Sequence, residues 1–83
     1  MREADFYAAK MQVLLEHCWT SSVAELARRA GVKRTYIYHL LRGRVSAPSF
    51  DKLLGISKAL GVEVSWWSEP LTAGPPPCQP PPS

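Results

Sequence analysis

Gly31 most constrains how this chain can fold, because it joins two short amphipathic segments with almost no linker between them. A glycine accepts a left-handed backbone at low cost, so it allows one helix to end and another to begin within a few residues. After Gly31, the apolar residues Val32, Ile37 and Leu40 indicate the buried side of a second helix. Before it, one helical face carries apolar residues at spacings of three and four: Val23, Leu26, Ala27 and Ala30.

Two short helices joined by a tight glycine turn form a helix-turn-helix. Ala27 supplies the small residue where the helices would cross, and Ile37 and Leu40 supply the branched side chains that hold the second helix. Ser22, with Glu25 three residues later, is a capping box that predicts where the first of these helices begins. We expect the motif at about residues 22–43, ending at a glycine.

The rest of the folded part also has helical spacing, with almost no period-two alternation. We predict a helix over residues 3–18, a helix after Ser49 that ends at Gly61, and a short last helix over residues 64–67. The fold class is therefore all-α, a compact domain of five helices over residues 1–68. The residues expected in its core outside the motif are Tyr7, Met11, Leu14, Leu15, Cys18, Phe50, Leu53, Ile56, Ser57 and Leu60.

Residues 69–83 are predicted to be an extended, disordered tail, because six prolines lie between positions 75 and 82. Cys18 and Cys78 are far apart, and they form neither a disulfide framework nor a metal-binding spacing. We therefore expect unpaired cysteines, a cytoplasmic protein, and no metal or other cofactor. No apolar run is long enough to cross a membrane, and the acidic N-terminus is unlike a secretory signal.

The charge is unevenly distributed along the chain. The net charge is only +3, but residues 26–50 contain six basic residues and no acidic one. A basic segment inside an otherwise slightly acidic chain is typical of a protein that binds a polyanion. A solvated helix face is the other interpretation of such a segment.

These features resemble the Cro/CI-type (lambda-repressor-like, XRE) helix-turn-helix family over about residues 22–67. The matching run is ELARRAGVKRTYIYHLLRGRVSAPSFDKLLGISKALGV. Members typically read E-L-A-x-x-A-G-V-S-x-x-x-I-S-x-x-x-x-G, then P-S before L-x-x-I-x-x-A-L-G-V. The resemblance implies a five-helix domain that places its third helix in the DNA major groove, usually as a dimer.

The third helix can be divided into faces by its rotation of about 100° per residue. Ile37, Leu40 and Leu41 fall on the core side, and Tyr36 falls on a flank. The side chains predicted to contact DNA bases are Arg34, Thr35, Tyr38 and His39. Those predicted to contact phosphates are Ser22, Lys33, Tyr36, Arg42 and Arg44.

Three positions depart from the family pattern. Val23 stands where members commonly have glutamine, Lys33 replaces the usual serine or threonine cap, and Leu41 stands where glutamate is frequent. Farther along, Trp66 and Trp67 are adjacent, so they point about 100° apart on a helix. We predict that Trp67 is in the core and that Trp66 is exposed at a homodimer interface.

The sequence therefore predicts a sequence-specific regulator that binds double-stranded DNA and acts as a repressor. One alternative is the DNA-binding antitoxin of a toxin–antitoxin pair, which would also bind a toxin protein through Trp66 or the tail. Another is an interaction module that has lost DNA binding. An enzyme is not expected, because the sequence shows no catalytic carboxylate pair, phosphate-binding glycine loop or activated nucleophile.

Overall fold

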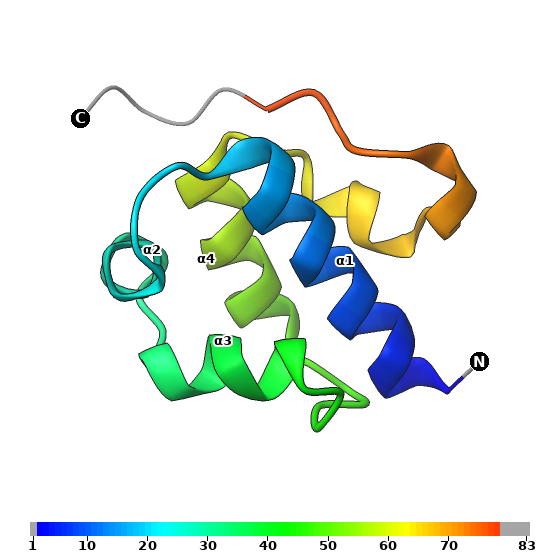
Figure 1. The fold of residues 1–83 in the computed structure, drawn as a ribbon, viewed down its shortest axis with the longest axis horizontal. Coiled ribbons are helices and arrows are strands. Elements are labelled where there is room, and N and C mark those ends of the chain that lie inside the picture. The colour runs from blue at the N-terminus through cyan, green and yellow to red at the C-terminus, as the bar shows by residue number, and fades with distance from the viewer. Residues whose placement is uncertain (1, 79–83) are drawn as a thin grey trace.

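The computed structural model describes residues 2–78, and within them the chain forms helices joined by loops (Figure 1). The four α-helices are α1 (Glu3–Cys18), α2 (Val23–Ala30), α3 (Arg34–Leu41) and α4 (Phe50–Leu60). Two 3-10 helices follow, η1 (Val64–Ser68) and η2 (Leu71–Ala73). The all-helical fold class is confirmed, whereas the predicted fifth helix is the 3-10 helix η1.

The helix ends lie where local sequence signals predicted them. Ser22 and Ser49 precede α2 and α4, and each hydroxyl accepts a hydrogen bond from the backbone N–H three residues later, at 3.1 and 3.3 Å. Gly31 and Gly61 follow the same helices with left-handed φ values of 73° and 69°. These serines and glycines therefore determine where α2 and α4 begin and end.

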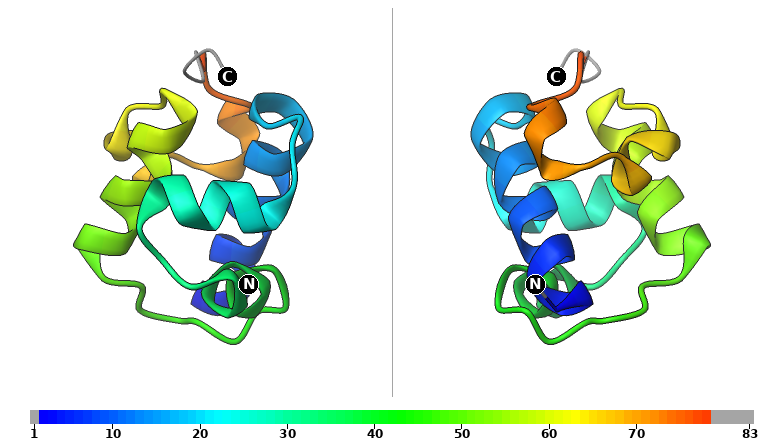
Figure 2. Two further views of the ribbon diagram at one scale, coloured as in Figure 1. Left: turned by 90° about the vertical axis from the view of Figure 1, so that its left-hand side faces the viewer. Right: turned by 90° about the vertical axis from the view of Figure 1, so that its right-hand side faces the viewer.

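The core lies between α1, α2, α3 and α4. Helix α2 packs against both α3 and α4, and α1 packs against α3; Figure 2 shows α2 running across the molecule between α1 and α4. The backbones of α2 and α4 approach closely, since a Cβ atom on Gly55 would lie 2.3 Å from the carbonyl oxygen of Ala30. The fully buried apolar side chains are Met11, Leu14, Leu26, Ile37, Leu40, Ile56 and Leu60.

Phe50 differs from the predicted core, because 62% of it is exposed. The other predicted residues of its helix, such as Leu53 and Ile56, are buried. Phe50 is the first residue of α4, and helical side chains lean toward the N-terminus of their own helix. Its ring therefore projects past the end of α4, and the prediction that it belongs to the core is wrong.

Trp66 and Trp67 are both buried, with 4% and 3% of their surface exposed. The indole N–H of Trp67 donates to the Ser57 hydroxyl at 2.8 Å, which confirms its core position. The prediction that Trp66 is exposed at an interface is wrong, because the chain after η1 folds back over it. The indole N–H of Trp66 donates to the carbonyl oxygen of Gly74 at 3.2 Å.

Lys10 is a buried lysine that lies against Trp66, with 1% of its surface exposed. Its ammonium group donates to the carbonyl oxygen of Trp66 at 2.7 Å and lies 3.9 Å from the centroid of the Trp66 ring. Burial lowers the pKa of Lys10, and the nearby charge of Glu69 partly opposes that shift. The aromatic face and one carbonyl group thus hold a cation inside the domain.

Residues 69–78 have a defined course against the domain. They form η2, which contacts α1, and then run to Cys78, which is bonded to Cys18 in a disulfide. The predictions of unpaired cysteines and of a disordered tail are therefore wrong for this segment, because the disulfide joins it to the last residue of α1. The remaining predicted tail residues, 79–83, lie outside the described part of the chain.

Candidate nucleic-acid interface

Helix α3 is fixed by its apolar side. Ile37 and Leu40 are fully buried in contact with the core, and Leu41 is partly buried beside them. This is the buried face that the rotation around the helix predicted. Helices α1 and α2 both contact α3, so its orientation is set by two neighbours rather than by its own short length.

The opposite side of α3 faces solvent. All four residues predicted to contact bases are exposed: Thr35, Tyr38 and His39 on this side, and Arg34 in the first turn of α3. Arg34 and Thr35 belong to the first turn of α3, and Tyr38 and His39 follow one turn later. The arrangement is thus a fixed helix that exposes a guanidinium group, a hydroxyl group and two ring side chains to solvent.

The turn between α2 and α3 holds the two helices in their relative orientation. The backbone N–H groups of Gly31 and Val32 both donate to the carbonyl oxygen of Ala27, the latter at 3.1 Å. Lys33 occupies the position before α3 and makes no side-chain capping bond. The first backbone N–H groups of α3 therefore have no side-chain cap, at the helix end that attracts anions.

Two arginines of the basic segment form ion pairs with Glu25. Its carboxylate receives hydrogen bonds from Arg28 and from Arg29, and these bonds hold the pKa of Glu25 at about 2. Ser22 accepts the backbone N–H of Glu25, so only half of the predicted capping box is formed. Arg28 and Arg29 thus share one acid of their own helix, which offsets part of their positive charge.

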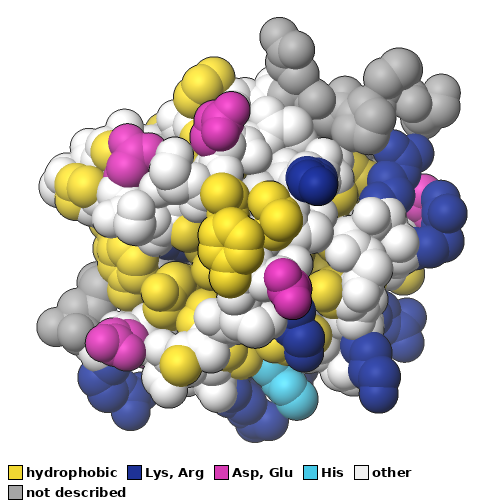
Figure 3. Space-filling model, turned by 180° about the vertical axis from the view of Figure 1, so that it is seen from behind, with side chains coloured by type: hydrophobic (Ala, Val, Ile, Leu, Met, Phe, Trp, Pro, Cys, Tyr) yellow, Lys and Arg dark blue, Asp and Glu magenta, His cyan; other side chains and the backbone are white. Residues whose placement is uncertain are grey.

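The other basic residues surround the exposed face of α3. Within residues 2–78, no ion pair involves the four predicted contacts Lys33, Arg34, Arg42 and Arg44, and all four are exposed. The guanidinium carbon of Arg42 lies 5.9 Å from the ring centroid of Tyr38. Figure 3 shows Lys and Arg side chains gathered along the two edges where Figure 1 places α2 and α3. The unpaired positive charge therefore borders the surface of α3.

Tyr36 does not offer the phosphate contact predicted for it. Its hydroxyl oxygen is buried, and it has no hydrogen-bond partner among the described residues. Burial raises the pKa of this hydroxyl. Tyr36 points inward from the flank of α3 because its ring packs against the core cluster. Beside the Tyr36 ring, a lysine of α4 reaches the solvent.

That lysine, Lys52, is a candidate contact that sequence analysis missed. Its ammonium group lies 4.3 Å from the ring centroid of Tyr36, and it lines a groove of about 400 Å³ together with Lys33, Thr35 and His39. No acidic residue lines this groove. The signal in the sequence was weak because Lys52 lies just past the basic segment and follows Asp51. Only the packing of α4 beside α3 brings it to the same surface.

Other kinds of site receive little support from the described residues. Within residues 2–78, no three His, Cys, Asp or Glu side chains are grouped closely enough to hold a metal ion. None of the helices in this range combines the length and the apolar character that crossing a bilayer requires.

Comparison with known proteins adds one positive finding. A family model described as helix-turn-helix matches residues 21–67, which include α2, the turn, α3, α4 and most of η1. No curated protein and no solved structure gave a significant match. The matched range contains the exposed face of α3 and the groove beside it.

Proposed function

Because the chain belongs to the Cro/CI-type helix-turn-helix family, we propose that it is a sequence-specific repressor that binds double-stranded DNA with α3 in the major groove. This family consists of DNA-binding transcription regulators. The observation that carries the proposal is the exposed face of α3, whose other face is locked to the core by Ile37 and Leu40. A rigid helix of this kind fits the width of the major groove.

Specificity is assigned to the side chains that α3 presents. Arg34 lies in the first turn, which is the part of a recognition helix that reaches base edges. Its guanidinium group has the two parallel donors that match the two acceptors of guanine. Thr35, Tyr38 and His39 extend the same face and would contact neighbouring base pairs, including thymine methyl groups.

Affinity and orientation are assigned to the flanking groups. Lys33 and the uncapped N–H groups at the start of α3 would bind one phosphate, and Arg42 and Arg44 would bind phosphates beyond its other end. The exposed Ser22 hydroxyl and the start of α2 provide a further position. Lys52 takes the place that sequence analysis had given to Tyr36, since its ammonium group borders the same groove.

We also propose that a second copy of the chain docks through an apolar face on the far side of Figure 1. Figure 3 shows this apolar patch, and a groove of about 370 Å³ there is lined by Tyr7, Phe50, Leu53, Val64 and Trp67. The exposed ring of Phe50 would enter the partner's groove, and a twofold arrangement would place two α3 helices on one operator. This face replaces Trp66 as the dimer contact.

Selection of bound duplexes from a random DNA pool tests the function directly. We expect an enriched, two-fold symmetric motif, with an affinity that falls steeply as salt rises because several phosphates are neutralised. Failure to enrich any motif, together with an affinity that does not respond to salt, would refute DNA binding. Sedimentation tests the dimer: Phe50→Ser should lower the mass, whereas the exposed control Gln12→Ala should not.

A further inference from the structure

The C-terminal strap, defined here as residues 69–78, is joined covalently to the domain at its far end. Cys78 is bonded to Cys18, the last residue of α1, and their Cα atoms are 5.8 Å apart. We propose that this disulfide is a thiol-reversible clasp. While the bond is closed the strap covers Trp66, and when a dithiol reductant opens it the strap leaves and Trp66 becomes accessible.

The closed strap makes defined contacts with the domain. The indole N–H of Trp66 donates to the carbonyl oxygen of Gly74 at 3.2 Å, and Pro76 is buried. Helix η2 contacts α1 earlier in the strap. These contacts explain why Trp66 is 4% exposed although it lies near the end of the folded chain.

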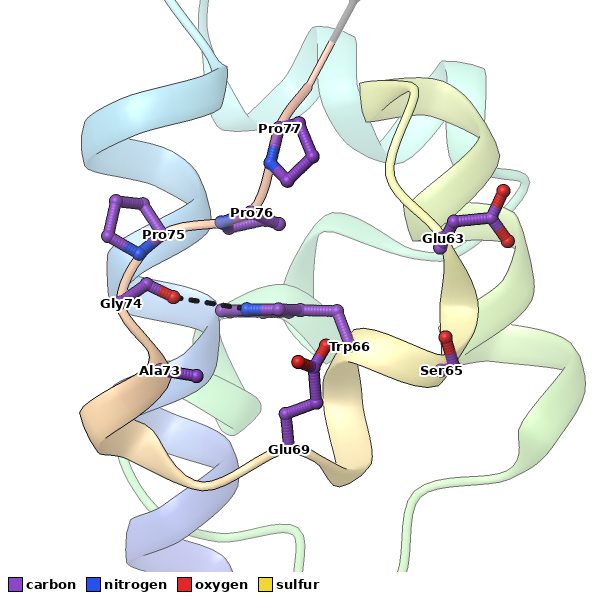
Figure 4. Close-up of a pocket in the computed structure, with 9 residues that line it drawn as sticks. All are labelled: Glu63, Ser65, Trp66, Glu69, Ala73, Gly74, Pro75, Pro76 and Pro77. Carbon is purple, nitrogen blue, oxygen red and sulfur yellow. Dashed lines mark hydrogen bonds between the residues drawn. The ribbon is translucent and has the colours of Figure 1, made fainter.

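Apart from the disulfide, few hydrogen bonds join the described residues of the strap to the domain. A pocket of about 280 Å³ lies between the strap and the domain, lined by Glu63, Ser65 and Trp66 of the domain and by Glu69 and residues 73–77 of the strap (Figure 4). Because this pocket separates part of the strap from the domain, the strap does not pack against the domain along its whole length. Four of its ten residues are prolines, which cannot donate a backbone hydrogen bond. The covalent bond is therefore what fixes the far end of the strap.

The opening reaction is ordinary thiol–disulfide exchange. A thiolate of the reductant attacks the sulfur of Cys78, which is more accessible than the 4%-exposed Cys18. The bond between the two cysteine sulfurs breaks, and Cys18 leaves as a thiolate that takes a proton from water. The second thiol of the reductant, as its thiolate, then displaces Cys78. Two cysteine thiols and one oxidised dithiol result, and two electrons have moved to the protein.

The clasp and the proposed DNA-binding face lie on opposite sides of the molecule. Figure 1 shows the strap along one side of the domain and α3 along the other. Opening the clasp therefore changes what the strap side exposes, namely the Trp66 indole and the ammonium group of Lys10 beside it. The orientation of α3 rests on Ile37 and Leu40, which are buried in the core.

Nuclear magnetic resonance of the three tryptophan indole N–H groups tests the clasp in the full chain. In the oxidised protein we expect slow solvent exchange at Trp66. Reduction with dithiothreitol should move the Trp66 signal and speed its exchange, while the signal of Trp67, bonded to Ser57, stays in place. Trp66→Phe identifies the signal. Oxidised glutathione should restore the first spectrum and an intramolecular disulfide seen by mass spectrometry.

A matched variant separates the clasp from other effects of the reductant. Cys78→Ser should show the reduced spectrum in oxidising buffer and should not change when dithiothreitol is added. Cys78 is only partly buried, so this substitution spares the core that a change at Cys18 would disturb. An unchanged Trp66 signal after both thiols have been freed and alkylated would overturn the proposal. Failure of the cysteines to pair in oxidised glutathione would overturn it as well.

Discussion

Neighbouring residues of α3 have opposite environments. Ile37 is fully buried, whereas Tyr38 beside it is 38% exposed. This alternation follows from the rotation of 100° per residue, so each side chain can be assigned to packing or to recognition. Substitutions on the exposed face should therefore change DNA binding without changing stability.

Arg34→Ala should relax sequence preference at one base pair. The lost bidentate contact to guanine would cost about 1–3 kcal/mol on the selected operator and little on DNA that already lacks that guanine. Competition binding against single-base operator variants measures this difference. Arg42→Ala, at the residue that follows α3, is the matched control, because it should weaken all sequences alike. An equal loss on operator and random DNA would assign Arg34 to phosphate binding instead.

Lys52→Ala should reduce the salt dependence of DNA binding. Removing one phosphate contact lowers the slope of log affinity against log salt by about 1. Lys58→Ala provides the control, since Lys58 is an exposed lysine of the same helix that does not line the groove beside α3. Titration by fluorescence anisotropy at several salt concentrations gives both slopes. If the two variants have the same slope as the unaltered chain, Lys52 does not contact the DNA.

At the scale of helices, the contact between α2 and α4 depends on a missing side chain. Gly55→Ala would place a Cβ atom 2.3 Å from the carbonyl oxygen of Ala30, and a backbone atom cannot move aside as a side chain can. We expect a loss of about 1–3 kcal/mol in the free energy of unfolding, despite the better helix propensity of alanine. Urea denaturation checks this, with Lys58→Ala as a near-neutral surface substitution in the same helix.

The cluster of Glu25 with Arg28 and Arg29 makes the stability of α2 depend on pH. The folded-state pKa of Glu25 is lowered from an ordinary value of 4.5 to about 2, chiefly by the hydrogen bond from Arg28. The ionised carboxylate stabilises the folded state fully when the pH is above the pKa of Glu25 in the unfolded chain. This contribution is lost as the pH falls through the lower pKa of the folded state. Glu25→Gln should therefore destabilise the protein near pH 7, and this difference should shrink as the pH falls from 4.5 toward about 2. Denaturation of both proteins across this range would reveal a constant difference if the cluster were inert.

Sequence signals predicted the helices well because their causes are local. The caps at Ser22 and Ser49 and the glycines at positions 31 and 61 act within a few residues, so a single sequence displays them. Trp66 was misjudged because its environment depends on a segment that returns over it. Lys52 and Tyr36 were misjudged for a similar reason, since α3 and α4 meet only in three dimensions.

At the scale of the whole molecule, the disulfide should be a major source of stability. It joins residues 60 positions apart, and closing a loop of that length in the unfolded chain contributes up to about 4 kcal/mol. Urea denaturation with and without dithiothreitol should show a lower midpoint for the reduced protein. Cys78→Ser should be unaffected by the reductant, and equal midpoints for the oxidised and reduced chains would exclude this contribution.

The disulfide could not be predicted from the sequence, whereas the family could. The two cysteines show no pairing pattern, and a proline-rich segment separates Cys78 from the domain. No local sequence signal determines the path of such a segment. The helix-turn-helix is recognisable since its determinants lie within residues 21–67. On the side of the domain away from α3, the sequence therefore left the course of the proline segment undetermined.

The bond between Cys18 and Cys78 also turns most of the chain into a closed covalent ring that contains α2, α3 and α4. A pulling force applied at the two ends of the oxidised protein would pass through the sulfur atoms and bypass that ring. The loop between the cysteines, which are 60 positions apart, would then release none of its contour length, roughly 200 Å when extended. The helices of the helix-turn-helix would therefore bear no pulling force until the bond is reduced.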